Sequence, residues 1–187
     1  MILLETERLR LRRFTGEDVD LLVDLDSDPE VMRYITYGVP TPREAYVATY
    51  LPRWFAIYAA QPELGYFAAE RRDSGAFLGW FHLRDDRIEP EYLELGYRLR
   101  RDAWGAGFAT EGARALVRHG FTRAGAGQIS ARTLVHNVAS QRVMEKCGLR
   151  RVGSFVYAAD VIAGRSEDER AAVKYSITRS EWLQRQD

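Results

Sequence analysis

The chain has 187 residues, and its 27 lysines and arginines balance its 27 aspartates and glutamates. This length suits one domain, 1–187, with a single hydrophobic core. The balanced charge argues against binding to a nucleic acid, and the lack of an apolar run of about 18 residues argues against a membrane span. The single Cys147 excludes an intramolecular disulfide and a cysteine-based zinc site, so we expect a cytoplasmic protein without a metal.

The first half of the chain predicts a strand, two helices and a hairpin. Apolar residues alternate with arginines up to Phe14, which is typical of a half-exposed strand. Thr15 is a favourable N-cap for a helix that ends before Pro29, and a second helical stretch is expected over about 42–60. Two apolar runs within 65–83 flank a turn-forming segment and predict an antiparallel pair.

The second half alternates strands with helices. It predicts, in order, a strand over 92–99, a helix over about 109–121, a strand over 128–135, a helix over 137–147 and strands over 151–157 and 170–178. Gly148 and the apolar Leu149 after it are typical of a helix C-terminus. The pattern contains no internal repeat and no linker, which agrees with one domain.

A glycine-rich run, WGAGFATEGA, joins the strand over 92–99 to the next helix. Gly105 and Gly107 permit positive φ and a close approach of the backbone, so several N–H groups can point into one small volume. The N-terminus of the helix adds free N–H groups and the positive end of its dipole. The run therefore indicates a site for a phosphate or diphosphate, and the alternative is a tight turn without a ligand.

Five segments in the same order resemble the GNAT superfamily of acyl-CoA N-acyltransferases. They are LETERLRLRRF at 4–14, SDPEVMRYI at 27–35, ELGYRL at 94–99, WGAGFATEGARAL at 104–116 and NVASQRVMEKCGLR at 137–150. Within the superfamily they are similar to the RimJ/RimL-like group, which includes N-terminal acetyltransferases of ribosomal proteins. The chain departs from the superfamily pattern at Asp102, where many members carry arginine or glutamine, so we expect backbone N–H groups to hold the ligand.

The resemblance implies an α/β fold with a mixed, mostly antiparallel sheet of six to seven strands, about four helices and splayed central strands. It also implies that acetyl-CoA is the cosubstrate, with its diphosphate at the glycine run and its pantetheine arm between the strands over 92–99 and 128–135. The residues that it assigns to this ligand are Tyr97, Leu99, Trp104, Gly105, Ala106, Gly107, Phe108, Ala109, Thr110 and Asn137.

Transfer of an acetyl group needs a neutral amine, and therefore a base. Glu94 is the first candidate, since its strand lies beside the expected thioester and some relatives carry a carboxylate there. The alternative is a solvated glutamate, and His82 and His136 are weaker candidates. Ser140 matches a family serine near the CoA sulfur and is assigned as the proton donor to the thiolate, although Asn137 and Ser140 also fit a helix N-terminus.

A backbone N–H near Arg98 or Leu99 is expected to stabilise the negative charge that grows on the carbonyl oxygen. The acceptor pocket is expected between the early helices, including 46–58, and the late loop at 158–169. Acidic residues of that loop, Asp160, Glu167 and Asp168, are candidates to attract an amine, or are simply solvated.

We therefore predict an acetyl-CoA-dependent N-acetyltransferase that transfers directly to a primary amine, with no covalent intermediate. The acceptor at the family level is a protein N-terminal α-amine, and a free amino acid, a polyamine or an aminoglycoside is nearly as good a fit. The competing hypothesis is a module that senses or binds acyl-CoA without turnover. Relatives are often dimeric, so a homodimer is one assembly that the resemblance allows.

Overall fold

The computed structural model describes residues 1–159, 162 and 164–185 and contains one mixed sheet. The sheet has 8 strands in the order β1-β2-β3-β4-β5-β6-β8-β7. The strands are β1 (Ile2–Glu5), β2 (Leu9–Arg13), β3 (Gly65–Arg71), β4 (Phe77–Asp85), β5 (Leu93–Leu99), β6 (Gln128–Leu134), β7 (Arg150–Val156) and β8 (Ala171–Thr178). Every neighbouring pair is antiparallel except β5 and β6, which run parallel.

Helices connect and cover these strands. They are α1 (Val19–Ser27), α2 (Pro29–Met32), α3 (Arg43–Ala45), α4 (Leu51–Ala60), α5 (Phe108–Thr122), α6 (Val138–Lys146), α7 (Glu167–Arg170) and α8 (Arg179–Leu183), with short helical turns at Gly16–Asp18 and Arg101–Ala103. A π-helical turn, Tyr46–Tyr50, joins α3 to α4, so the predicted helical stretch over 42–60 is one nearly continuous element. No helix of the described residues is long and apolar enough to cross a membrane.

The predicted fold is confirmed, but the strand count was too low. The additional strand is β1, which forms a hairpin with β2 at one edge of the sheet. Its four residues are exposed or half-buried, and the hydrophobic alternation that predicts a half-buried strand is therefore weak there. The short helices α7 and α8 were not predicted either, because each is shorter than two helical turns.

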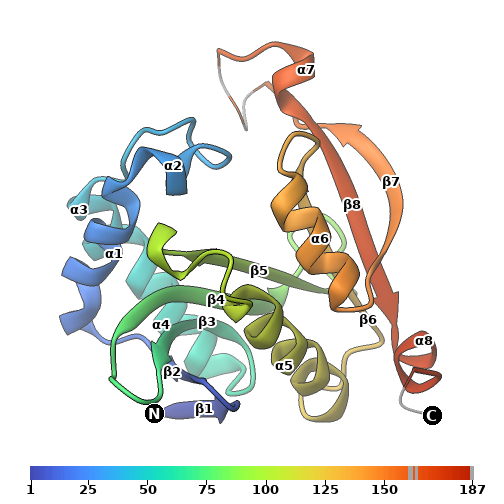
Figure 1. The fold of residues 1–187 in the computed structure, drawn as a ribbon, viewed down its shortest axis with the longest axis horizontal. Helices are drawn as coiled ribbons and strands as arrows, with labels where there is room; N and C mark the ends of the chain where they lie inside the picture. Colours follow the sequence, from blue (N-terminus) through green and yellow to red (C-terminus); the bar gives the residue numbers. More distant parts are fainter. Residues whose placement is uncertain (160–161, 163, 186–187) are drawn as a thin grey trace.

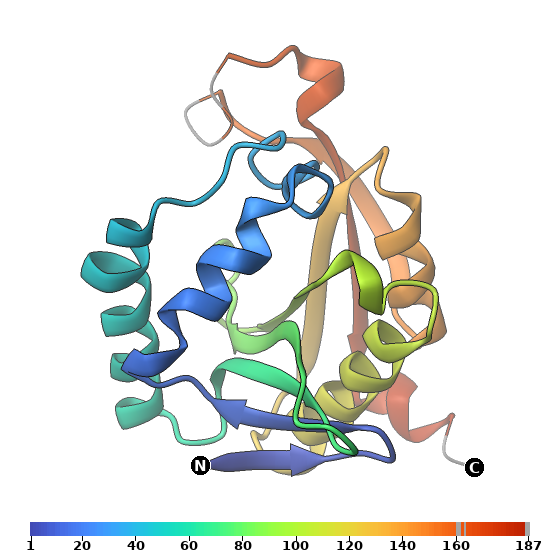
Figure 2. The same ribbon diagram turned by 60° about the vertical axis from the view of Figure 1, so that its left-hand side comes forward.

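Helices cover both faces of the central strands (Figures 1 and 2). On one face, Phe81 of β4 packs against Gly112 of α5, which has no side chain to obstruct the ring. On the other face, Tyr66 of β3 stacks on Trp54 of α4 at 4.4 Å between ring centroids. Figure 2 shows α1 and α4 on one side of the molecule and α5 and α6 on the other. Strand β5, in the middle, is therefore enclosed from both sides.

Candidate active site

The central strands β5 and β6 separate shortly after they meet. They pair at two positions, Leu93 with Ile129 and Glu94 with Ser130, whereas β5 is paired to β4 along its whole length. Beyond Glu94 the facing edges of β5 and β6 have no strand partner among the described residues. We call the opening between them the wedge, and the two paired positions its fork. This is the splayed geometry that the family resemblance implied.

The open edge of β5 presents a defined set of backbone groups. The N–H of Arg100 donates to the carbonyl of Leu78 on β4 at 2.9 Å. Since alternate residues of a strand point to opposite edges, the N–H of Leu99 faces the wedge and the N–H of Arg98 faces β4. The carbonyl of Leu99 accepts from the Trp104 indole at 2.9 Å, in agreement with this assignment. Of the two predicted donors for the carbonyl oxygen, Leu99 is therefore the one that lies on the correct edge.

The glycine run forms a tight turn at the mouth of the wedge. Gly105 and Gly107 have φ values of +73° and +85°, which L side chains rarely adopt, and Gly107 is the N-cap of α5. None of the described side chains accepts a hydrogen bond from the first turn of α5. The N–H groups of this turn are free to bind an anion, and the helix dipole favours one there. The turn therefore fits the diphosphate that the sequence predicted.

Arg8 supports this turn, a role that no pattern in the sequence indicated. Its guanidinium donates to the carbonyl of Ala106 at 2.9 Å, pairs with Glu111 of α5 at 2.6 Å and lies 4.6 Å from the centre of the Phe108 ring. Burial disfavours the charged form of Glu111, but hydrogen bonds from Thr6 and Arg8 lower its pKa below the usual value. The β1–β2 hairpin thus holds both the glycine turn and the start of α5.

Glu94 lies at the fork, on the face of β5 opposite the leucines. Its side chain is only 17% exposed, so it is not the solvated glutamate of the alternative interpretation. It forms an ion pair with Arg84, its cross-strand partner on β4, and its carboxylate lies 3.8 Å from the guanidinium of Arg132. Burial raises the pKa of Glu94 above 4.5, the Asp86 carboxylate raises it further, and the arginines oppose this effect.

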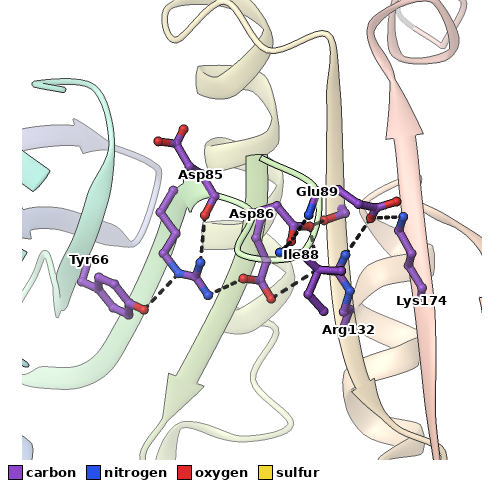
Figure 3. A network of polar contacts seen from close by, with 10 residues as sticks. Tyr66, Asp85, Asp86, Ile88, Glu89, Arg132 and Lys174 are labelled. Carbon is purple, nitrogen blue, oxygen red and sulfur yellow. Dashed lines mark hydrogen bonds and ion pairs between the residues drawn. The ribbon is translucent and has the colours of Figure 1, made fainter. Parts of the chain in front are cut away.

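The contacts of Glu94 belong to a row of polar side chains that crosses the sheet (Figure 3). Arg132 donates to Asp86 at 2.6 Å and to Glu89 at 2.7 Å, and Ser130 donates to Asp86 at 2.5 Å. Lys174 of β8 pairs with Glu89. Sequence reasoning did not select any residue of this row except Glu94. These residues do not form one sequence motif, because they come from the β4–β5 loop and from strands that lie far apart in the chain.

Asn137 and Ser140 both contact groups of the protein. The Asn137 side chain accepts from the N–H of Ser140 at 3.2 Å and so caps α6, as the structural alternative required. The Ser140 hydroxyl lies 3.0 Å from the hydroxyl of Tyr97, which also donates to the Ser140 carbonyl. Burial raises the pKa of Tyr97 above 10, and the hydrogen bond to Ser140 opposes the shift. Tyr97 and Ser140 therefore bridge β5 and α6 beside the wedge.

The two histidines that the sequence raised as weaker bases lie in different surroundings. His82 is buried against Gly96, and neither of its ring nitrogens has a hydrogen-bond partner among the described residues. Burial lowers the pKa of His82 well below 6.5, and the nearby arginines Arg84 and Arg98 lower it further. The side chain of His136 is 57% exposed, and Asp168 lies 3.5 Å from it. His82 is thus a neutral side chain packed near the fork.

The loop after α2 contacts the late segment around α7 through Tyr37. The hydroxyl of Tyr37 donates to the carbonyl of Glu169 at 2.8 Å, and Arg165 lies 4.0 Å from the centre of the Tyr37 ring. Tyr37 has a φ of +59°, a strained value for a residue with a side chain. Glu167 and Asp168 are exposed, and Asp160 lies outside the described residues.

Tyr157 is a further titratable side chain coupled to Glu94, and the sequence did not indicate it. Burial raises its pKa above 10, and the Glu94 carboxylate adds to this shift. The residue directly follows β7, and its N–H donates to the carbonyl of Arg170 at 3.1 Å. The sequence pattern placed Tyr157 only at the end of a strand and did not indicate that its phenol would be influenced by Glu94.

Comparisons with known proteins agree with this geometry. The model of the acetyltransferase (GNAT) domain family matches residues 8–150. The FsC-acetyl coenzyme A-N(2)-transacetylase of Aspergillus fumigatus is 32% identical in an alignment that covers 98% of this chain and 79% of the relative's length. YoaA of Bacillus subtilis, described as an uncharacterized N-acetyltransferase, is 30% identical over 81% of this chain and 84% of its own.

Solved structures show the same architecture. An acetyltransferase (GNAT family) from Bacillus anthracis superimposes with a TM-score of 0.76 at 25% identity, covering 96% of this chain and 99% of its own. The spermidine N-acetyltransferase of Vibrio cholerae, in complex with CoA and spermine, has a TM-score of 0.74 at 18% identity and covers 95% of this chain and 99% of its own. At that identity the second likeness shows the fold alone.

Proposed function

The chain belongs to the GNAT family of acetyl-CoA-dependent N-acetyltransferases, and we propose that its acceptor is an α-amine, with Glu94 as the base. The observation that carries this proposal is the position of Glu94, a largely buried carboxylate at the fork whose pKa burial raises. A carboxylate base whose pKa is raised suits an α-amine, with a pKa near 8, better than an alkyl amine with a pKa near 10.

The relative in Aspergillus fumigatus supports the same class of acceptor. Its name specifies transfer to an N(2) nitrogen, and an amine on carbon 2 of an amino-acid derivative is an α-amine. Both an amino-acid derivative and the N-terminus of a peptide present such a group. The segments shared with the RimJ/RimL-like group favour the N-terminus of a protein, and we propose membership of that group on those segments.

Acetyl-CoA fits the residues at the wedge. We propose that the free N–H groups of the glycine turn and the first turn of α5 bind its diphosphate, and that the open edges of β5 and β6 bind the pantetheine arm. The N–H of Leu99 would stabilise negative charge on the carbonyl oxygen, and the Ser140 hydroxyl, hydrogen-bonded to Tyr97, would protonate the departing thiolate. Glu94 would take the proton of the amine.

A polyamine is the second candidate, since the Vibrio cholerae enzyme that shares the fold acts on spermidine. The test is an acceptor screen at neutral pH with detection of the released CoA thiol. It compares peptides with free N-termini, α-amino-acid amides, the same peptides blocked by N-acetylation, and spermidine. We expect kcat/KM for the free α-amines to exceed that for spermidine at least about tenfold. Turnover of spermidine alone would contradict the α-amine proposal.

A further inference from the structure

The loop between β4 and β5 is fastened across the fork by one buried arginine. Asp86 begins this loop and is fully buried, while the side chain of Arg132 on β6 is 4% exposed. Arg132 donates to Asp86 at 2.6 Å and to Glu89 of the same loop at 2.7 Å. The loop that leads into β5 is therefore bound to β6 at the place where the two strands separate (Figure 3).

The fork needs such a fastening because its backbone pairing is slight. Two register positions join β5 to β6, and parallel strands are held less firmly per residue than antiparallel ones. Buried ion pairs with several hydrogen bonds contribute geometric specificity when each partner is satisfied. Burial opposes the charge of Asp86, but hydrogen bonds from Ser130, Ile88 and Arg132 lower its pKa, so the carboxylate remains ionised.

Arg132 also reaches the carboxylate of Glu94 at 3.8 Å. We propose that Arg132 is a positioning residue, which fixes the point where β5 and β6 separate and holds Glu94 beside that point. The proposal rests on the proposed function of the wedge and of Glu94. Its consequence is that the depth to which the pantetheine arm can enter and the position of the base are set by the same guanidinium. In reactions of this kind, a misplacement of about 1 Å can cost about 100-fold in rate.

Other charged groups also act on Glu94, so the experiment must separate them. The charged groups that influence its pKa are Arg84 of β4, Asp86 and Arg87 of the loop, and Arg132 of β6. Arg84 pairs with Glu94 from β4, on the paired side of β5, and its other described hydrogen bonds go to Tyr66 and Asp85 rather than to β6. Lys174 pairs with Glu89 but does not contact Glu94 or Asp86. Arg84→Gln is thus the control for loss of a positive charge next to Glu94. Lys174→Gln is the control for loss of an ion pair to Glu89 without loss of the contact to Asp86.

The test measures CoA binding at equilibrium and the pH profile of kcat/KM for Arg132→Gln, Arg132→Lys, Arg84→Gln and Lys174→Gln. We expect Arg132→Gln to weaken CoA binding about tenfold and to move the acid limb of the profile to higher pH, because Glu94 loses a cation that lowers its pKa. Arg84→Gln should move the acid limb but keep CoA affinity within about twofold, and Lys174→Gln should change neither beyond about twofold.

Arg132→Lys keeps the charge but loses the planar fork that bonds to two carboxylates. It should weaken CoA binding while leaving the acid limb in place. CoA affinity in Arg132→Gln and Arg132→Lys equal to that of Lys174→Gln would overturn the proposal, and so would loss of folding in both variants. Equilibrium binding of CoA requires no turnover, and Glu94→Gln tests the base by itself. Failure of the proposed base would therefore be distinguished from failure of the fork.

Discussion

The sheet has two halves, β1–β5 and β6–β8, which meet at the β5–β6 pair; we call this meeting place, the fork and the wedge together, the seam. The halves and the seam differ in how completely their strands are paired. Strands β4 and β5 pair at seven positions and β6 and β8 also pair at seven, but β5 and β6 share two. A fully paired edge has no free N–H or C=O group to offer a ligand. The comparison teaches that the binding capacity of this fold lies where the sheet is least complete.

The buried side chains at the seam also differ in polarity from most of those in the two halves. Within each half most of the fully buried side chains are apolar, for example Phe67, Phe81 and Ile129, although Arg98 of β5 and the buried Asp26 of α1 also form an ion pair. At the seam the contacts are made by charged groups, Glu94, Arg132 and Asp86, which are largely removed from water. Ion pairs in such places contribute specificity of geometry more than stability. The following variants test how far the seam and the halves are independent.

Glu94→Gln is expected to have the largest effect, because it changes the chemistry of the seam and leaves the halves intact. Glutamine preserves the size of the side chain but cannot accept the proton of the amine. We expect kcat to fall about 100-fold while CoA affinity stays within about twofold. Since Glu94 acts only when ionised, the loss should be greatest above the raised pKa of Glu94 and below the pKa of the amine. Turnover that is unchanged across this pH range would remove Glu94 from the mechanism.

Gly107→Val tests the glycine turn at the mouth of the seam. Valine is strained at a φ of +85°, and its Cβ would lie 3.4 Å from the guanidinium of Arg8. We expect the affinity for CoA to fall about tenfold, measured as a smaller ligand-induced rise in Tm. The control is Gly127→Val, where φ is not positive and no described atom lies within 4 Å of the new Cβ. An undiminished Tm shift in Gly107→Val would contradict the assignment of the diphosphate site.

Arg8→Met should have the smallest effect. It sharpens the comparison because Arg8 belongs to the β1–β2 hairpin in one half of the sheet but contacts the glycine turn at the mouth of the wedge. The guanidinium holds the Ala106 carbonyl and Glu111, but it is 44% exposed. We expect CoA affinity, measured by calorimetry, to fall about threefold and the free energy of unfolding to change by less than about 1 kcal/mol. The control is Arg10→Met, whose ion pair with Glu5 stays within the hairpin. Equal effects of the two variants would show that the hairpin does not support the turn.

Local patterns in the sequence predicted much of the fold and part of the site. The alternation before Leu99 and the glycines after it were enough to locate β5 and the turn, because each signal lies within one segment. Resemblance then supplied the splayed strands. The burial of Glu94 was not predictable in this way, since alternation only places it on the face opposite the leucines. The side chains that pair with it there, Arg84 of β4 and Arg132 of β6, come from other strands.

The row of polar side chains could not be read from local patterns at all. Glu89 and Lys174 are 85 positions apart, and they meet because β8 lies beside β6 in the sheet. Arg8 and Glu111 are 103 positions apart. The hydrophobic periodicity of one strand does not indicate which distant strand will pair with it. The seam, which carries the chemistry, is therefore the region where the sequence is least informative and the tertiary structure most necessary.

The position of β8 in the sheet has a consequence for how the molecule is made. Strands β1 to β5 each pair with a neighbour in sequence, so this half can form while the chain is still being synthesised. Strand β6 receives its long antiparallel partner only when Ala171–Thr178 has emerged, close to the end of the chain. The wedge is then completed last. A chain that ends before residue 171 would contain β5, the glycine turn and β6, but β6 would lack the antiparallel partner that pairs with it at seven positions.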